Sequence, residues 1–462
     1  MSDTGSASNT LPTFTYQQIT QILTDDYWVY DDAERHYFQP ADGSTVTVNL
    51  VGLTADGQTL ARAALDVWAG LTPLVFVETT DPADITFTDD SNGAITFFTY
   101  SGSQQISAEI DISTQWLARY GTGFDTYSMQ TYLHEIGHAL GLGHAGFYDG
   151  GGTYANDAHY ANDSWQVSLM SYFDQTSNTA INASFAYAVT PMIADLLAIE
   201  DLYGPVDVNK GATIYGANSN VGGYLEDLFA EVFEPGFLLP DFAFTIKDTG
   251  GRDTLDFRWE TADQFIDMNP EGISNVGGLV GNMVIAVDTQ IEWAIVGRGD
   301  DEVIGNAAGN QIRGNAGNDR LIGGQRSDFL DGGSGNDTLS GNGGNDNLKG
   351  RGGNDRLFGG DGDDTLSGQS GNDIMDGGNG SDRFEFNFGD DVIRDFTDDV
   401  DTLALDDALW TGTLSVAQVL DSYIDDTEAT ATSVFFRFDT GDTLRVEGIN
   451  NDALLLDDIV FF

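Results

Sequence analysis

The sequence predicts an α+β domain followed by an all-β solenoid of parallel strands. In the first half of the chain, segments with the apolar spacing of helices alternate with short segments of strand-like alternation. From about residue 242, short β-type runs are separated by turns rich in glycine and aspartate. Glycine, aspartate and an apolar residue then recur every nine residues from residue 314, which is typical of a solenoid whose repeats stack on one another.

Length, charge and cysteine usage limit what the protein can be. A chain of 462 residues exceeds one ordinary core, so two or more domains are expected. Its net charge of −56 would repel nucleic acid and anionic lipid, so we expect neither as a partner. Without cysteine the chain has no disulfide, no thiolate ligand and no cysteine nucleophile. No apolar run approaches the length of a membrane span.

The N-terminal half carries the signals of a mixed domain. Residues 1–20 are polar and poorly patterned, which indicates a tail or a short propeptide. They include neither the basic patch nor the apolar core of a Sec-type signal peptide, and this alone leaves a cytoplasmic protein open. The expected elements are, in order, helix 18–23, strand 45–51, helix 54–72, strands 74–77, 85–88 and 95–100, helix 128–142, and a late helix from Pro191 to Gly204.

The run His-Glu-Ile-Gly-His-Ala-Leu-Gly-Leu-Gly-His, which begins at His134, predicts a zinc site. His134 and His138 are four residues apart, so they project from one face of a helix and can hold one metal ion. Glu135 stands beside the first ligand, where a carboxylate can act as general base on a water activated by the metal. Gly141 suits a left-handed turn that ends the helix and lets the chain bring His144 to the metal from a third direction.

The nine-residue repeat spans eight turns. Glycine holds its first position from Gly314 to Gly377, aspartate its sixth from Asp319 to Asp382, and an apolar residue its eighth from Leu321 to Phe384. We expect six residues to form a turn and three to form a strand, in which only the middle side chain points inward. Two repeats then complete one coil, so equivalent turns on one edge are 18 residues apart.

Carboxylates stacked at this spacing predict calcium sites. They would repel one another unless cations lie between them, and aspartate oxygens together with the carbonyls of glycine turns suit Ca²⁺. Because one inward residue in nine makes a thin core, we expect the repeat to be largely unfolded without calcium. A disordered acidic linker is the alternative, but it needs no apolar residue at every ninth position. The expected ligands are Gly297, Gly299, Asp301, Gly314, Gly317, Asp319, Asp328, Gly332, Gly335, Asp337, Gly341, Asp346, Gly350, Asp355, Gly359, Asp364, Asp373 and Asp382, with Asp253 as a further candidate.

Together these features resemble the serralysin family. The segment Ser-Leu-Met-Ser-Tyr around Met170 is similar to the Met-turn of metzincin proteases, and the glycine-aspartate repeat is similar to the repeats-in-toxin pattern. Serralysins are secreted bacterial metalloproteases that join these two modules. The resemblance spans about residues 15–462 and implies a metzincin catalytic domain followed by a calcium-binding parallel β-roll.

The resemblance implies a role for each residue of the site. The three histidines would bind one catalytic zinc ion, with Glu135 as general base. Met170 would form the structural floor beneath the metal. Tyr172 would be a catalytic residue that approaches the zinc, as a candidate ligand, in the free enzyme and stabilises the oxyanion during turnover. We expect a protein or peptide substrate to bind in extended form and to pair with the edge strand 95–100.

The resemblance also implies where the protein acts. Serralysins leave the cell through a type I secretion channel that reads an uncleaved C-terminal signal, an acidic residue followed by apolar ones, and residues 458–462 fit that pattern. We therefore expect a secreted, extracellular, monomeric endopeptidase with a proteinaceous inhibitor as a further partner. The expected domains are a tail or short propeptide at 1–20, the catalytic domain at 21–241, the lead-in and β-roll at 242–385, and a cap with the secretion signal at 386–462.

Some residues depart from the family pattern. Ala145 stands where proline is common and Phe147 where a small acidic residue is usual, which bears on specificity more than on catalysis. Asn310 and Ala308 weaken one early calcium half-site. Two alternatives remain: an adhesion or surface-layer protein with an inactive protease domain, and an astacin-like protease, although Ala145 is not the expected glutamate and the repeats do not belong there. His36 and His159 are expected to be ordinary surface or core residues.

Overall fold

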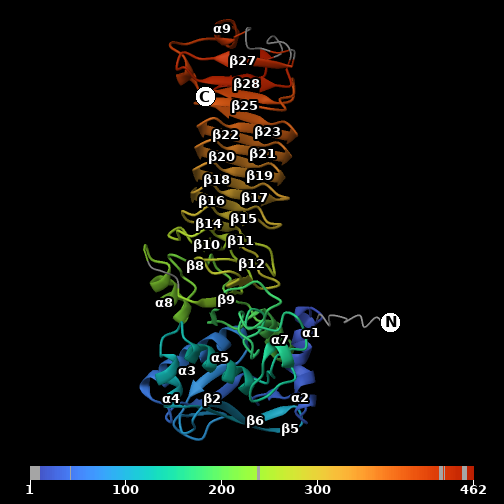
Figure 1. Ribbon diagram of the computed structural model, residues 1–462, viewed down its shortest axis with the longest axis vertical. Helices are drawn as coiled ribbons and strands as arrows, with labels where there is room; N and C mark the ends of the chain where they lie inside the picture. Colours follow the sequence, from blue (N-terminus) through green and yellow to red (C-terminus); the bar gives the residue numbers. More distant parts are fainter. Residues whose placement is uncertain (1–10, 42, 237–239, 426–429, 431, 450–454) are drawn as a thin grey trace, which may run out of the picture.

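The computed structural model describes residues 11–462 except 42, 237–239, 426–429, 431 and 450–454. The molecule is elongated and has two parts: helices around a mixed sheet form the lower part of Figure 1, and a stack of short strands forms the upper part. The expected α+β domain and parallel all-β roll are confirmed. Over these described residues, no helix is long and apolar enough to cross a membrane.

A six-stranded sheet forms the base of the N-terminal part, in the order β1-β6-β4-β2-β3 with β5 paired to β6. Its strands are β1 (Tyr37–Phe38), β2 (Thr45–Asn49), β3 (Val75–Glu78), β4 (Ile85–Thr88), β5 (Ala94–Ser101) and β6 (Gln104–Ile112). All pairs are parallel except β5 with β6, which form an antiparallel hairpin. In the described chain β5 pairs with β6 alone, so its other side is an open edge.

Helices cover one face of this sheet. They are α3 (Ala55–Leu71), α4 (Thr114–Tyr120), α5 (Tyr127–Ala139) and α7 (Ile193–Tyr203), with the short α6 (Tyr154–Asp157) in the loop between α5 and α7. The Trp68 indole of α3 is buried and donates to the Leu133 carbonyl of α5 at 3.1 Å, which fixes the two helices against each other. Gly204 ends α7 with a φ of +83°, a backbone conformation that favours glycine. The helices expected at 54–72, 128–142 and 191–204 are thus confirmed.

The start of the described chain is packed against this domain. It forms α1 (Tyr16–Gln21), the π-helical η1 (Ile22–Asp26) and α2 (Tyr27–Tyr30). Thr15 provides a capping box for α1, and Ile19 is fully buried. The helix expected at 18–23 is thus present as α1 and η1, and the expected tail or propeptide, residues 1–20, includes its first part. Residues 1–10 lie outside the described residues.

A small sheet joins the two parts of the molecule. It has the order β12-β13-β9-β7, from β7 (Tyr187–Ala188), β9 (Phe242–Ile246), β12 (Ile273–Ser274) and β13 (Met283–Ile285). The helix α8 (Gly223–Val232) follows β8 (Ile214–Gly216), which already belongs to the stacked sheets because it pairs in parallel with β10. The stack thus reaches back to residue 214, before the change in composition near residue 242.

Two parallel sheets form the roll. One has the order β29-β26-β24-β22-β20-β18-β16-β14-β10-β8, and the other β11-β15-β17-β19-β21-β23-β25-β28-β27, in which only β27 with β28 is antiparallel. Leu321 pairs with Leu339 and Leu339 with Leu357, so two repeats per coil are confirmed. The strands are β10 (Thr254–Asp256), β11 (Phe265–Asp267), β14 (Trp293–Ile295), β15 (Glu302–Ile304), β16 (Gln311–Ala316), β17 (Arg320–Gly324), β18 (Phe329–Ser334), β19 (Thr338–Gly343), β20 (Asn347–Gly352), β21 (Arg356–Asp361), β22 (Thr365–Ser370) and β23 (Ile374–Asn379).

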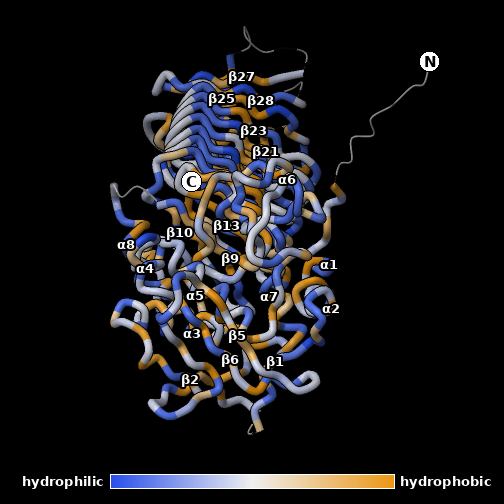
Figure 2. The backbone as a smooth tube through the Cα atoms, turned by 60° about the horizontal axis from the view of Figure 1, so that its bottom comes forward, coloured by the Kyte–Doolittle hydropathy of each residue, from blue (hydrophilic) through white to orange (hydrophobic). Residues whose placement is uncertain are grey.

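The strands of the roll are longer than expected. Strands β18 to β23 each run for six residues, because pairing continues through the glycine at the first position of the next repeat. That glycine is buried, and a Cβ at Gly332 would lie 2.3 Å from Oδ2 of Asp337. The expected apolar position still forms the core, since the leucine, methionine or phenylalanine at each eighth position is fully buried. The edge of the stack is a ladder of polar turns (Figure 2).

The C-terminal region continues both sheets beyond the repeats. It contains β24 (Arg383–Phe386), β25 (Asp390–Ile393), β26 (Thr402–Leu405), η2 (Asp407–Leu409), α9 (Val416–Tyr423), β27 (Ser433–Arg437), β28 (Thr443–Glu447) and β29 (Ile459–Phe461). The apolar end of the chain is a strand in this arrangement, because β29 pairs in parallel with β26. Phe384, Phe386 and Phe436 are fully buried there, as a cap on the solenoid requires.

Candidate active site

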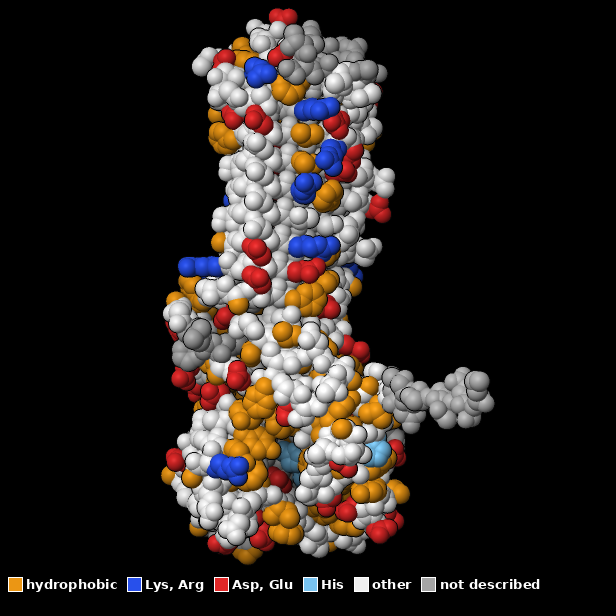
Figure 3. Space-filling model, in the orientation of Figure 1, with side chains coloured by type: hydrophobic (Ala, Val, Ile, Leu, Met, Phe, Trp, Pro, Cys, Tyr) orange, Lys and Arg blue, Asp and Glu red, His pale blue; other side chains and the backbone are white. Residues whose placement is uncertain are grey.

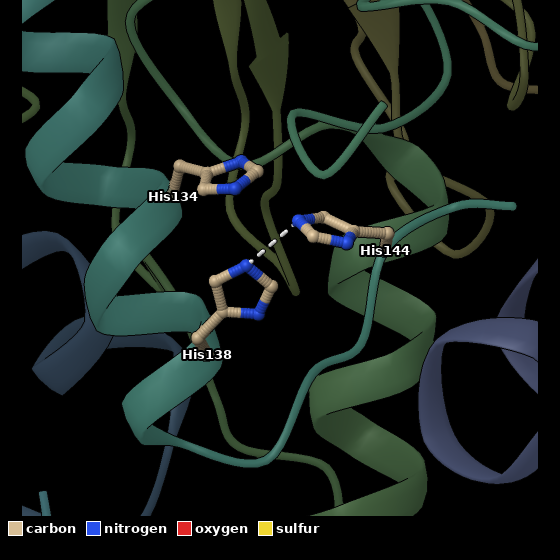
Figure 4. Close-up of side chains that lie close together, drawn as sticks. All are labelled: His134, His138 and His144. Atoms are coloured by element: carbon tan, nitrogen blue, oxygen red, sulfur yellow. Dashed lines mark hydrogen bonds between the residues drawn. The ribbon is translucent and has the colours of Figure 1, made fainter. Parts of the chain in front are cut away.

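Three histidine side chains converge at the centre of the N-terminal domain. His134 and His138 project from one side of α5, and His144 reaches them from the loop that follows the helix (Figure 4). One nitrogen of each ring lies within 4.8 Å of one nitrogen of the others. The chain can turn this sharply because Gly141 has a φ of +106°, and a Cβ there would lie 2.3 Å from the His36 carbonyl oxygen. The predicted turn at Gly141 is confirmed.

Hydrogen bonds hold each imidazole in one tautomer. Nδ1 of His134 contacts the Leu169 carbonyl at 2.9 Å, Nδ1 of His138 contacts the Leu142 carbonyl at 2.7 Å, and Nδ1 of His144 contacts the Tyr148 carbonyl at 3.0 Å. Since a carbonyl can only accept, each Nδ1 carries the proton and donates it. Each Nε2 is then a lone pair, which is the form that binds a metal ion.

The arrangement fits a metal ion. Burial lowers the pKa of His134 to about 4 and that of His138 to about 3, and it also lowers the pKa of His144, so all three rings are neutral. Nε2 of His138 and Nε2 of His144 are 3.1 Å apart, the contact drawn in Figure 4. Two lone pairs facing each other with no proton between them repel, and a shared divalent cation removes that repulsion.

Glu135 lines the same recess as the three histidines. Its side chain is 7% exposed, and Oε2 accepts a hydrogen bond from the Thr96 hydroxyl of β5 at 2.7 Å. Burial raises the pKa of Glu135 to about 7, where a carboxyl group can both take up and release a proton near neutral pH. Thr96 therefore connects this carboxylate to the open-edged strand.

Met170 and Tyr172 both lie beside the histidine cluster. Met170 is fully buried, and its Sδ would be 3.0 Å from a Cβ at Gly137, so it packs directly against α5 between the two helical histidines. The Tyr172 ring centroid is 4.4 Å from that of His144, and its hydroxyl accepts a hydrogen bond from the Gly150 N–H at 3.2 Å. Both residues of the expected Met-turn thus stand beside the site.

A recess of about 590 Å³ leads to the histidines, and His134, Glu135, His138, His144 and Tyr172 all line it. One group of histidine side chains is visible at the floor of this recess in the lower part of the molecule, between hydrophobic side chains (Figure 3). Ala94, Ile95, Thr96 and Phe98 of β5 form part of its wall, so the open edge of the sheet borders the recess.

The other residues singled out by sequence lie around this centre. His36 is fully buried and stacks on Tyr100 with a centroid distance of 4.3 Å, which confirms a core histidine. Ala145 is fully buried. The Phe147 ring lies 5.1 Å from the His159 ring and 5.6 Å from the Tyr30 ring, outside the lining of the recess.

The aspartates of the repeat form two columns along the roll. The backbone N–H of each aspartate donates to Oδ1 of the aspartate 18 residues later, at 2.7–2.9 Å from Asp319 to Asp373. The other oxygen, Oδ2, is buried and has no hydrogen-bond partner among the described residues at Asp319, Asp337, Asp346, Asp355, Asp364 and Asp373. Burial raises the pKa of these carboxyl groups, to about 8 at Asp319 and about 7 at Asp355. Buried carboxylate oxygens without partners fit cation binding.

The ends of the columns differ from their centre. Both oxygens of Asp301 accept backbone N–H groups, from Gln264 at 2.7 Å and Gly297 at 3.0 Å. The side-chain oxygen Oδ1 of Asn310 accepts a hydrogen bond from the Asn306 N–H at 2.9 Å. This turn therefore has a neutral amide at the position where neighbouring turns have a carboxylate. Asp253 is fully buried, and its Oδ2 has no partner in the described part of the chain. A cation thus fits Asp253 better than Asp301.

Two supporting residues of the centre are absent from the sequence-based expectations. Thr96 binds Glu135 across 39 residues of sequence, and only the alternation of β5 could have placed it on the inner face. Asp195 accepts the Ser168 hydroxyl at 2.6 Å and the Leu169 N–H at 2.8 Å, so it holds the segment whose Leu169 carbonyl orients His134. No local motif marks either residue.

Comparison with known proteins assigns both parts of this chain to metallopeptidases. The family model described as "Peptidase M10 serralysin C terminal" matches residues 205–458, and "Metallo-peptidase family M12B Reprolysin-like" matches residues 36–195. Metallopeptidase AprA of Pseudomonas marginalis is 34% identical over 346 residues, 66% of this chain and 68% of that protein.

Two proteins named serralysin show the same likeness over a shorter span. Serralysin A of Dickeya chrysanthemi is 38% identical over 258 residues, 53% of this chain and 52% of that protein. Serralysin of Photorhabdus luminescens is 34% identical over 264 residues, 54% of this chain and 53% of that protein. These alignments thus span about half the length of each relative. With the histidine cluster on α5 and the parallel roll behind it, the chain belongs to the serralysin family of metallopeptidases.

Proposed function

We propose that the chain is a zinc-dependent endopeptidase that hydrolyses extracellular proteins and peptides. The observation that carries this proposal is the convergence of three neutral imidazoles, each with its Nε2 lone pair free, beside a buried carboxylate in one recess. Three nitrogen ligands with an open fourth position are typical of catalytic zinc. Similarity to AprA and to the serralysins supports the same activity.

The proposed roles follow from the contacts of each residue. Zinc held by His134, His138 and His144 would act as a Lewis acid and lower the pKa of a coordinated water. Glu135 would take up the proton and pass it to the leaving amine, and the Thr96 hydroxyl, bonded to Oε2, keeps this carboxylate in place. The Tyr172 hydroxyl, which accepts a hydrogen bond from the Gly150 N–H in this structure, would donate a hydrogen bond to the oxyanion.

The substrate would lie along the open edge of β5. An extended peptide can pair with β5 by main-chain hydrogen bonds, because this side of the strand has no described neighbour and borders the recess. Main-chain pairing places few demands on side chains, which suits an endopeptidase acting on unfolded or extended segments of proteins.

A casein-cleavage assay tests the proposal. The untreated protein should cleave casein, lose activity after metal is removed, and regain it when zinc is added back in the presence of calcium. A protein that binds zinc and calcium yet cleaves neither casein nor a peptide library would contradict the proposal and favour an adhesion protein with an inactive protease domain.

We further propose that the roll binds calcium and folds with it after export. The orphaned Oδ2 atoms of the two columns, together with turn carbonyls of the glycines named above, would provide the ligands. Sites of the extracellular type bind at about 10⁻⁴–10⁻³ M, so the roll would stay unfolded in the cytosol and fold outside the cell. The C-terminal residues 458–462 would serve the type I secretion machinery, and the free enzyme would be a monomer open to a proteinaceous inhibitor.

The same proposal divides the chain into domains. The catalytic domain would end near residue 241, the lead-in and β-roll would reach residue 385, and the cap with the secretion signal would follow. Removal of residues 458–462 should abolish export through a type I channel while purified, refolded protein keeps its activity. Undiminished export of the truncated chain would contradict the assignment of the signal.

A further inference from the structure

Asp163 is a fully buried carboxylate that the proposed mechanism does not use. Its Oδ1 accepts two hydrogen bonds, from the Tyr148 hydroxyl at 3.1 Å and from the Ser171 hydroxyl at 2.7 Å. Its own carbonyl accepts from the Asn178 amide at 3.0 Å, which fixes the loop that carries it. One oxygen atom therefore joins two segments that are 23 residues apart in the sequence (148 and 171).

Each of these two segments carries a functional group of the site. The Tyr148 carbonyl accepts the Nδ1 proton of His144 at 3.0 Å, so the position of Tyr148 sets the orientation of the third imidazole. Ser171 directly precedes Tyr172, and its hydroxyl oxygen also accepts the Phe173 N–H at 3.1 Å. Ser171 thus fixes the backbone on both sides of the tyrosine that would bind the oxyanion.

The two segments also touch each other through their rings. The Tyr148 and Tyr172 centroids are 4.9 Å apart, and the Tyr172 and His144 centroids are 4.4 Å apart. A displacement of Tyr148 would therefore reach both the third ligand and the tyrosine. Both Tyr148 and Ser171 are buried, so water cannot replace the acceptor that Asp163 provides.

We propose that Asp163 is a positioning residue, whose Oδ1 holds Tyr148 and Ser171 so that His144 and Tyr172 face the same metal ion. This inference rests on the proposed function for its effect on turnover, but not for its effect on metal binding. What matters is an acceptor at the Oδ1 position, because both contacts are made by neutral hydroxyl donors. The charge of the carboxylate is not required.

The test compares two substitutions at one position in the full-length chain with calcium present. Asp163→Asn keeps an oxygen at the Oδ1 position, and Asp163→Ala removes it. The zinc Kd is measured by competition with a chelating dye, and kcat and KM are measured on a casein-derived peptide. Tyr154→Phe is the matched control, since it removes a nearby hydroxyl that donates to the Ala161 carbonyl instead.

The expected result separates the two variants. Asp163→Ala should weaken zinc binding by about 10–100-fold and lower kcat by a similar factor, because loss of an outer partner of a ligand has effects of that size. KM should change by less than about twofold, since the residue does not touch the substrate. Asp163→Asn and Tyr154→Phe should keep the zinc affinity and the kcat of the unmodified protein.

A second set of variants covers the case in which Asp163→Ala fails to fold. Tyr148→Phe and Ser171→Ala each remove one donor, and Tyr148→Phe should weaken zinc binding while Ser171→Ala should mainly lower kcat. Combined with Asp163→Ala in a folded protein, Tyr148→Phe should add less than its separate effect, because both break the same hydrogen bond.

Three results would overturn the inference: unchanged zinc affinity and kcat in Asp163→Ala, damage by Asp163→Asn equal to that by Asp163→Ala, or unchanged zinc affinity in Tyr148→Phe. If the unmodified protein cleaves no peptide, the proposed function fails. The zinc Kd of the same variants still decides the role of Asp163, so the two failures are distinguishable.

Discussion

The histidine cluster and the aspartate columns both fit cations, but their polar atoms are arranged in opposite ways. Around the histidines, every imidazole already has its Nδ1 bonded to a backbone carbonyl, and only the metal-binding lone pairs face inward. In the columns, one oxygen of each central aspartate is buried without any partner among the described residues. The hydrogen bonds of the histidine cluster thus orient its side chains without a cation, whereas the aspartate columns leave buried oxygens without hydrogen bonds.

The N-terminal domain also has a larger apolar core than the roll. The N-terminal domain buries Trp28, Trp68, Tyr132, Phe87 and many aliphatic side chains. Each coil of the roll buries little more than two leucines, because each nine-residue repeat sends one apolar side chain inward. These differences support the proposal that zinc binds to a preformed domain, while calcium takes part in the folding of the roll.

The largest expected effect lies at the preformed site. Glu135→Gln keeps the size of the side chain and the contact with Thr96 but cannot take up a proton, so kcat should fall by about 10²–10⁴-fold. Zinc content and the thermal transition should not change, because the three ligands are untouched. Zinc analysis and peptide hydrolysis check this, and an active Glu135→Gln protein would contradict the role of the base.

Tyr172→Phe should have the next largest effect. The ring would keep its contact with His144 while the hydroxyl is lost, so kcat should fall by about 10²–10³-fold with little change in KM. Steady-state kinetics on one peptide separates the two constants. A variant that mainly raises KM would place Tyr172 in substrate binding and not at the oxyanion.

Leu348→Ala tests the thin core of the roll. Leu348 is fully buried, and its truncation should cost about 2–5 kcal/mol of the stability of the calcium-loaded roll. Ile322 provides the control. It follows the inward-facing Leu321 in an adjacent coil and is half-buried, so Ile322→Ala should cost less. Denaturation followed by intrinsic fluorescence checks both, and zinc affinity should be unchanged in each variant. An equal cost in the two variants would contradict a single apolar column.

The smallest expected effect is the change with pH in the stability of the calcium-free roll. The pKa of Asp319 is raised to about 8 and that of Asp346 to about 7, both by burial, so the folded roll binds protons more tightly than the unfolded chain. Its stability is then greatest below pH 4 and is lost as the pH rises through these values. The calcium-free roll should therefore be more ordered at pH 5 than at pH 8, by circular dichroism. A calcium-free roll that gains order with rising pH would contradict this.

The sequence predicts the chemistry of both regions because their patterns are local. The spacing of His134 and His138 specifies one face of a helix, and the nine-residue period specifies stacked turns, so both follow from short-range geometry. The strand β6 is not among the expected strands, because buried and exposed residues alternate irregularly along it. The extra length of the roll strands depends on close contact between each first-position glycine and an aspartate oxygen. The sequence pattern alone does not show this contact.

The supports of the active site could not be predicted in the same way. Thr96, Asp163 and Asp195 are ordinary residue types at positions far from the motif, and tertiary packing alone brings them to Glu135, Ser171 and Leu169. The helix expected at 18–23 is present, but its first residues lie in the segment expected to be a tail, because Ile19 is the single buried side chain of α1 and leaves little local signal.

Hydrogen exchange of the full-length chain, with zinc present and calcium either present or absent, tests the central claim most directly. Without calcium, amides of β17 to β23 should exchange as fast as those of an unfolded chain, while amides of α5 around His134 and His138 should remain protected. Protected strands in the calcium-free roll would contradict the claim that calcium is part of its fold. Loss of protection in α5 under the same conditions would contradict the claim that the zinc site is preformed.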